Sequence, residues 1–164
     1  MPAVKNRLQD VKLDIKASAR ETLVELLNQT LADTSDLVSQ FKQAHWNVRG
    51  MDFWQFHQMY DAVHAALEPF VDEVAERIST LGGVAMGTVR MAAASSKVKE
   101  FPGGFGDSKK FTTELRDRLA AYAKQVRSDI EAAEKAEDPT TADLLTEISR
   151  AADLQLYFLE SHLH

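Results

Sequence analysis

Four side chains that could bind a metal ion recur along one stretch of the chain, in two pairs with helical spacing. The pairs are His57 with Asp61 and Asp72 with Glu76. In an α-helix, residues four positions apart lie one turn apart on the same face, so each pair could converge on one ion. Mixed imidazole and carboxylate ligands suit ferrous iron, and manganese and zinc are alternatives that the spacing does not separate. The pattern therefore predicts a metal centre.

The two pairs cannot share an ion within one chain. Fifteen residues separate His57 from Asp72, which is about 22 Å along a helix, whereas metal–ligand bonds are only about 2 Å long. The numbers of His57 and Glu76 sum to 133, and so do those of Asp61 and Asp72. A two-fold axis near position 66.5, beside the small Ala65, would place each pair opposite the other pair of a second copy. We therefore predict two equivalent sites in a symmetric dimer.

His45 is a candidate further ligand because it lies on the apolar stripe of the preceding helical segment, between Phe41 and Val48. Each member of the set also has an ordinary interpretation. His57 and Asp61 alone could be an exposed pair one turn apart, the two later acids a solvated face, and His45 a hydrogen-bonded buried histidine. The mirror spacing of the whole set favours the metal site over a purely structural oligomer interface.

Apolar residues at helical spacing predict an all-α fold. The expected long helices cover residues 18–48, 53–81, 111–130 and 140–159, with a short helix at 89–94 in the crossover 84–106. Two hairpins joined by a long crossover form a four-helix bundle of ferritin-like connectivity. Pro69 removes one backbone hydrogen bond and predicts a kink in the second helix. No strand is predicted. We expect residues 18–164 to form one bundle domain, preceded by a mobile tail, residues 1–17.

The composition limits the classes of function. The chain has no cysteine, which excludes disulfides and thiolate metal sites. It has no apolar run long enough to span a membrane and no signal-peptide pattern in its first ten residues, so we expect a cytoplasmic protein. A net charge of −6 argues against a surface that binds nucleic acid as a whole. The first twenty residues alone are basic, with a balance of +3.

Several segments resemble the signature of the Dps family, the bacterial miniferritins. They are QAHWNVRG at 43–50, DEVAER at 72–77, LGG at 81–83, MGT at 86–88, DPTTAD at 138–143 and FLE at 158–160. The resemblance covers nearly the whole chain. It implies a hollow homododecamer that oxidises Fe(II), preferentially with hydrogen peroxide rather than oxygen, at di-iron ferroxidase centres, and stores the ferric mineral. Such a protein protects the cell and its DNA from oxidative damage.

The resemblance also implies roles for individual residues. The ferroxidase ligands are His45, His57 and Asp61 from one subunit, with Asp72 and Glu76 from its partner. Trp46 resembles the family tryptophan thought to absorb stray oxidising equivalents, and packing in the interface is its alternative role. Asp143 and Asp138 resemble the acidic lining of a three-fold iron-entry pore, and either could instead be an ordinary acid at a helix N-terminus.

Some members of the family bind DNA through a lysine-rich tail. The tail of this chain is short and mildly basic, and the residues it would use are Lys5, Arg7, Lys12 and Lys16. The alternative function is therefore a nucleoid-associated protein that compacts DNA and for which iron chemistry is secondary. Asp10, Asp14 and the acidic body oppose this alternative, whereas multivalency of twelve tails would favour it.

Overall fold

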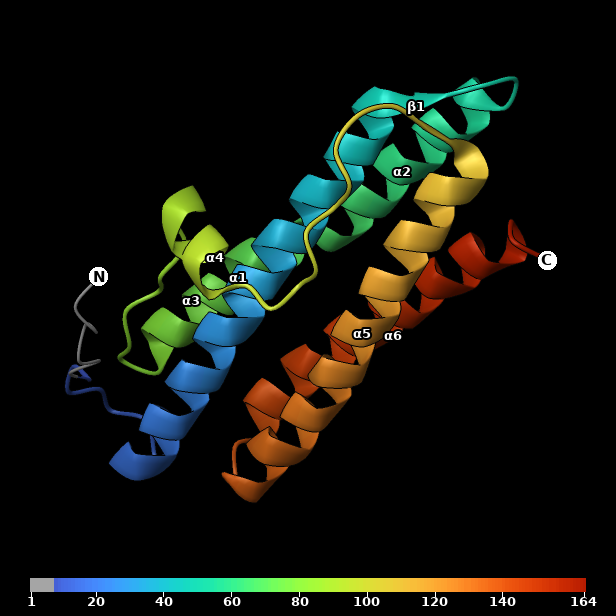
Figure 1. Cartoon of the computed structure of the whole chain (residues 1–164). Coiled ribbons are helices and arrows are strands. Elements are labelled where there is room, and N and C mark those ends of the chain that lie inside the picture. The colour runs from blue at the N-terminus through green and yellow to red at the C-terminus, as the bar shows by residue number, and fades with distance from the viewer. Residues whose placement is uncertain (1–7) are drawn as a thin grey trace.

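Two antiparallel helical hairpins pack together in the computed structural model, which describes residues 8–164 (Figure 1). The first comprises α1 (Ala17–Asn47) followed by α2 (Phe53–Leu67) and α3 (Pro69–Thr80), and the second comprises α5 (Ser108–Lys135) and α6 (Pro139–Ser161). A long crossover containing the short α4 (Val89–Ser95) joins them. The predicted four-helix bundle with one short helix in its crossover is confirmed.

The predicted apolar stripes form the core between the four long helices. Its largest fully buried side chains include Tyr60, Phe41 and Phe111. Hydrogen bonds also cross this core: the Tyr60 hydroxyl pairs with Thr112 at 2.9 Å, and burial raises the pKa of Tyr60 to about 12, so the phenol stays neutral. Within residues 8–164, none of the helices combines the length and the apolar composition needed to cross a membrane.

Pro69 divides the predicted second helix into α2 and α3. Glu68, between them, keeps helical backbone angles (φ −59°, ψ −38°), and its N–H donates to the carbonyl of His64 at 2.9 Å. Pro69 has no N–H, so the carbonyl of Ala65 has no helical donor four residues later. The two helices follow one another along α1 (Figure 1). The structure therefore has a local break in hydrogen bonding at the place where we expected a kink.

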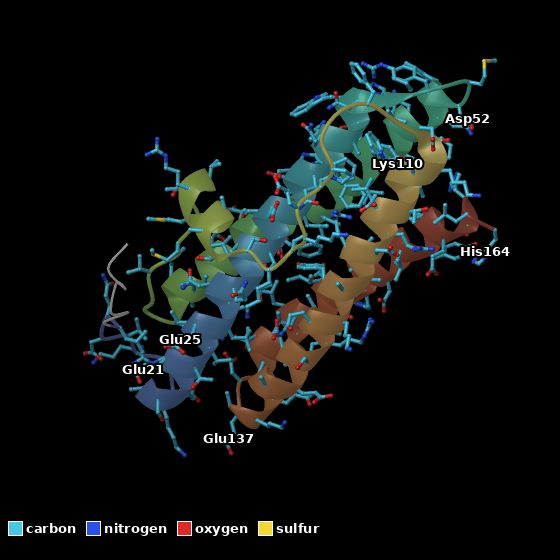
Figure 2. The ribbon with its side chains drawn as sticks, viewed as in Figure 1. Glu21, Glu25, Asp52, Lys110, Glu137 and His164 are labelled. Atoms are coloured by element: carbon cyan, nitrogen blue, oxygen red, sulfur yellow. The ribbon has the colours of Figure 1, made fainter. Side chains whose placement is uncertain are left out.

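Two short strands tie the crossover to the end of α1, a feature that the sequence pattern does not predict. Val48–Arg49 (β1) pairs in parallel with Gly106–Asp107 (β2). A Cβ atom at Gly106 would lie 2.1 Å from the ring of Phe111, so only glycine permits this close approach. Figure 2 shows Asp52 and Lys110 at this same end of the molecule, where α2 and α5 begin.

Residues 8–16, here called the N-terminal strap, lie against the bundle. The N–H of Gln9 donates to the carbonyl of Gly82 at 2.8 Å, and the buried Arg20 donates to the carbonyls of Gln9 and Leu81. Gly82 has φ +84°, and a Cβ atom there would lie 2.7 Å from the Gln9 carbonyl. Of the mobile tail predicted for residues 1–17, residues 1–7 lie outside the described part, and the strap makes fixed contacts with the bundle.

Asp138 holds the turn between α5 and α6. Its carboxylate caps α6 by accepting from the N–H groups of Thr140 and Thr141 and forms a two-pronged ion pair with Arg77 of α3. Burial opposes ionisation, but the hydrogen bonds from Thr141 and Arg77 outweigh it and hold the pKa of Asp138 below its usual range. One carboxylate therefore joins the two hairpins.

We expect Asp138→Ala to destabilise the fold by about 3–5 kcal/mol, because it leaves the half-buried Arg77 guanidinium without its partner. Asp143→Ala, which changes an exposed acid on the same helix, is the matched control and should cost far less. Because the pKa of Asp138 is lowered in the fold, its contribution is complete above the ordinary aspartate pKa. It is lost as pH falls through the lower folded value. Thermal unfolding at fixed protein concentration between pH 7 and pH 2 measures both effects, and equal losses in the two variants would contradict the assignment.

Candidate metal centre

His45 and His57 form the centre of the candidate site, where the end of α1 meets the start of α2. Their rings stack with centroids 3.6 Å apart and an angle of 18° between the planes. The Nδ1 atom of His45 lies 2.7 Å from the carbonyl oxygen of His57, and the Nδ1 atom of His57 lies 2.8 Å from the carbonyl oxygen of His45. These reciprocal hydrogen bonds hold the two helices and both rings in one geometry.

The same hydrogen bonds determine which ring nitrogen can bind a metal. A carbonyl oxygen only accepts hydrogen bonds, so each Nδ1 carries the hydrogen. In the neutral ring the lone pair then lies on Nε2. Imidazole ligands in metal sites are held in this way, with the second ring nitrogen donating to a carbonyl or carboxylate. In neutral His45 and His57, Nε2 is therefore the ring nitrogen that is able to bind a metal.

Asp61 lies one turn after His57 and forms an ion pair with Lys42 of α1. The hydrogen bond from the Lys42 ammonium is the main cause that holds the pKa of Asp61 below its usual range, and the charge of Lys42 contributes in the same direction. The Lys42 ammonium is thus already paired, as a cation, with the Asp61 carboxylate that we predicted to bind metal. We did not predict Lys42, although its place three residues before His45 on the same helix could have indicated it.

Aromatic side chains surround the two imidazoles. Phe53 stacks on His57 with centroids 4.9 Å apart, and Trp54 lies 6.2 Å from the same ring. Trp46 and Trp54 are 59% and 69% exposed. Sequence reasoning identified Trp46 and missed Trp54, which lies three residues before His57 and so one turn away on the same helix. Two exposed indoles beside one half-buried site are typical of a surface that another protein covers.

Asp72 and Glu76 lie on α3 and are exposed. In the hydrogen bonds and ion pairs of residues 8–164, neither carboxylate has a partner. Within this described part of a single chain, no group of three or more His, Asp or Glu side chains is close enough to hold one metal ion. The structure thus brings the rings of His45 and His57 together, with Asp61 one turn further along α2, and leaves Asp72 and Glu76 on α3.

The two predicted pore residues differ in their surroundings. Asp138 is only 1% exposed and is fully engaged by Arg77, Thr140 and Thr141. In the single chain this carboxylate therefore has a structural role, as a helix cap and ion-pair partner. Asp143 is exposed, and the pore lining stays a prediction that the single chain favours at Asp143.

Comparison with known proteins agrees with this architecture. The family model of the ferritin-like domain matches residues 24–164. The DNA protection during starvation protein of Agrobacterium fabrum is 36% identical over 93% of this chain and 94% of its own length. The chain belongs to the Dps family. Another Dps relative, DNA protection during starvation protein 1 of Deinococcus radiodurans, is 32% identical over 86% of this chain and 68% of its own length.

Solved Dps structures share the fold. DpsA14 from Streptomyces coelicolor superposes with a TM-score of 0.92 at 31% identity, covering 97% of this chain and 94% of that one. An archaeal Dps homologue from Halobacterium salinarum superposes with a TM-score of 0.91 at 27% identity, covering 100% and 91%. The similarity to solved Dps structures thus extends over nearly the whole chain.

The ion pair at Asp61 leads to a prediction about metal affinity. We expect Lys42→Gln to tighten binding of Co²⁺ by up to about tenfold, because the ammonium no longer competes for the carboxylate or repels the cation. Anaerobic calorimetric titration of the assembled protein measures this affinity. Lys110→Gln, which changes an exposed lysine at the start of α5, is the control. Equal affinities in the native protein and Lys42→Gln would show that the ion pair does not compete with metal.

Proposed function

We propose that this Dps protein oxidises Fe(II), preferentially with hydrogen peroxide, at centres shared between two subunits, and stores the ferric product inside a hollow dodecamer. The observation that carries the proposal is the reciprocal hydrogen bonding of His45 and His57, which leaves a lone pair on each Nε2, with Asp61 one turn further along α2. Such a donor set holds a metal ion and is incomplete within one chain. The cage, its mineral and its cytoplasmic location rest on the family resemblance.

The missing ligands come from the partner subunit in this proposal. A two-fold axis near position 66.5 pairs α2 and α3 antiparallel with their copies and brings Asp72 and Glu76 of one subunit to His57 and Asp61 of the other. Three features of this surface support such burial: the unpartnered acids of α3, the exposed Trp46 and Trp54, and the small, exposed Ala65 at the axis. Each dimer would then contain two equivalent centres.

In this reaction iron is the substrate. The imidazoles and carboxylates hold two Fe²⁺ ions and leave coordination positions open for the oxidant. Two Fe²⁺ ions supply the two electrons that one peroxide molecule needs, and with two protons the products are two Fe³⁺ ions and two water molecules. Because both electrons go to the same peroxide molecule, the reaction avoids the release of hydroxyl radical. Trp54 lies 6.2 Å from the ring of His57 and Trp46 directly follows His45 in the chain, so these indoles are the candidates to lose an electron if oxidation proceeds singly.

Subunit complementation tests the shared site directly. We expect both His57→Ala/Asp61→Ala and Asp72→Asn/Glu76→Gln to lose rapid, peroxide-driven iron oxidation. Co-assembled from equal amounts, the two variants should regain about a quarter of the native rate, because half of randomly formed dimers are mixed and each mixed dimer has one intact centre of two. Stopped-flow ferric absorbance after anaerobic Fe²⁺ loading measures the rates.

The controls for this experiment concern assembly. Both variants must have the native particle size, and mixing them after assembly, without subunit exchange, should restore nothing. Restored oxidation without co-assembly, or none with it, would reject a site built from two chains. An undiminished rate in either variant alone would place the oxidation elsewhere, and the structural-oligomer interpretation would then gain.

DNA binding is the second candidate, because the relatives described above are named for DNA protection. Of the basic residues expected to bind DNA, Lys5 and Arg7 lie outside the described residues, whereas Lys12 and Lys16 are exposed on the strap. Contacts from these lysines would have a steep salt dependence. Gel-shift assays of the native protein and Lys12→Gln/Lys16→Gln from 20 to 200 mM salt, at about equal particle concentration, decide whether the strap contributes.

A further inference from the structure

His64 and Glu68 form a third histidine–carboxylate pair on the face that carries the proposed ferroxidase ligands. They lie one turn apart, and the backbone between them is helical because the N–H of Glu68 donates to the carbonyl of His64. On a helical wheel with His57 at zero, they fall at about −20° and 20°, next to Asp61 at about 40°. His64 is half-buried and Glu68 is exposed.

The imidazole of His64 is held like those of the other two histidines. Its Nδ1 atom lies 3.1 Å from the carbonyl oxygen of Val38, so Nδ1 carries the hydrogen and Nε2 of the neutral ring offers a lone pair. The carboxylate of Glu68 has no hydrogen-bond or ion-pair partner within residues 8–164. A fixed imidazole and a free carboxylate therefore stand side by side, with no role in the ferroxidase centre.

The position of this pair along the helix is its distinguishing feature. The numbers of His64 and Glu68 sum to 132, one less than the sum of the ferroxidase partners. In the same antiparallel dimer, His64 would lie within one residue, or about 1.5 Å along the helix, of Glu68 of the second copy. All four side chains of the two copies would lie within about 4 Å of the two-fold axis along the helix direction. The ferroxidase pairs are centred about 11 Å from it.

The break at Pro69 adds an oxygen at the same place. Because Pro69 has no N–H, the carbonyl of Ala65 has no helical donor, and Ala65 is exposed. A proline beside the axis therefore costs one helix hydrogen bond, at the carbonyl of Ala65.

We propose that one divalent cation binds on the two-fold axis, held by Nε2 of His64 and the carboxylate of Glu68 from each of two subunits. The proposal rests on the two-fold packing of the proposed function but does not involve its chemistry. Two neutral imidazoles and two carboxylates form a four-ligand set of the kind that Zn²⁺ and Co²⁺ take in tetrahedral sites. Two negative charges balance a divalent ion. The bound ion would link two subunits, and the stoichiometry would be one ion for every two chains.

The test uses Co²⁺ and the full-length His57→Ala/Asp61→Ala assembly, in which two of the five proposed ferroxidase ligands are removed. We expect titration to give the intense visible absorption of tetrahedral Co²⁺, saturating at one ion per two chains. Adding Glu68→Gln or His64→Gln should abolish this absorption. Adding His162→Ala should leave it unchanged, because His162 also donates through Nδ1 to a carbonyl but lies exposed at the end of α6.

Three outcomes would overturn the proposal: no tetrahedral absorption, saturation at one ion per chain, or absorption that persists in both Gln variants. The iron chemistry is judged separately, by the complementation experiment and by the rate of Fe²⁺ oxidation in Glu68→Gln alone, which should match the native protein. Complementation with no axial Co²⁺ would reject the axial site and keep the shared ferroxidase centre. Binding of Co²⁺ on the axis without complementation would keep the axial site and reject the shared ferroxidase centre.

Discussion

The reciprocal hydrogen bonds between His45 and His57 are the constraint on which the rest of the site depends. Each imidazole closes onto the backbone of the other helix, so the end of α1 and the start of α2 cannot shift without breaking two hydrogen bonds and a ring stack. Because these hydrogen bonds use Nδ1, they leave Nε2 as the nitrogen with the lone pair in each neutral ring. The same contacts that join the two helices therefore also fix the orientation of the two candidate ligands.

A second constraint is the length of the helix that carries the remaining candidates. α2 and α3 continue along α1, and the acids on α3 stay far from His57 along that direction (Figure 1). No rotation of side chains crosses about 22 Å. A centre that uses both groups therefore needs a second chain, and this requirement comes from helix geometry whatever the metal is. The family match shows the fold and the relatives. The separation along the helix explains why a centre that uses both groups would need a second chain.

Sequence periodicity predicted what depends on local spacing. The four long helices, the short crossover helix and the pairs on one face of α2 and α3 all follow from repeats of three and four residues. Contacts between distant segments were not predicted. β1 and β2 are two residues each, too short to show an alternating pattern. The ion pair of Lys42 with Asp61 and that of Arg77 with Asp138 join different helices, so no window of sequence contains both partners.

Asp138 shows what a motif match alone leaves out. The motif marks the acid at the start of α6, but only the packing of α3 against that turn shows that the carboxylate is buried by Arg77. The candidate ligands and their polar neighbours could be predicted from the sequence only where they lie on the same face of one helix. The strap contacts at Gly82 were not, because they depend on the close approach of residues that lie more than seventy positions apart.

The distribution of unpartnered acids separates structural carboxylates from those available for binding. The buried Asp33 accepts hydrogen bonds from Gln29 and from the N–H of Lys97, and the buried Asp138 is paired with Arg77. By contrast, Glu68, Asp72 and Glu76 follow one another along a single helical face without a partner in the described chain. An exposed acid alone is ordinary. Three of them at helical spacing, beside imidazoles with fixed Nε2 lone pairs, concentrate negative charge and cation ligands on the surface that a two-fold dimer would bury. Burying that charge without cations would be costly, so the proposed interface would favour metal binding.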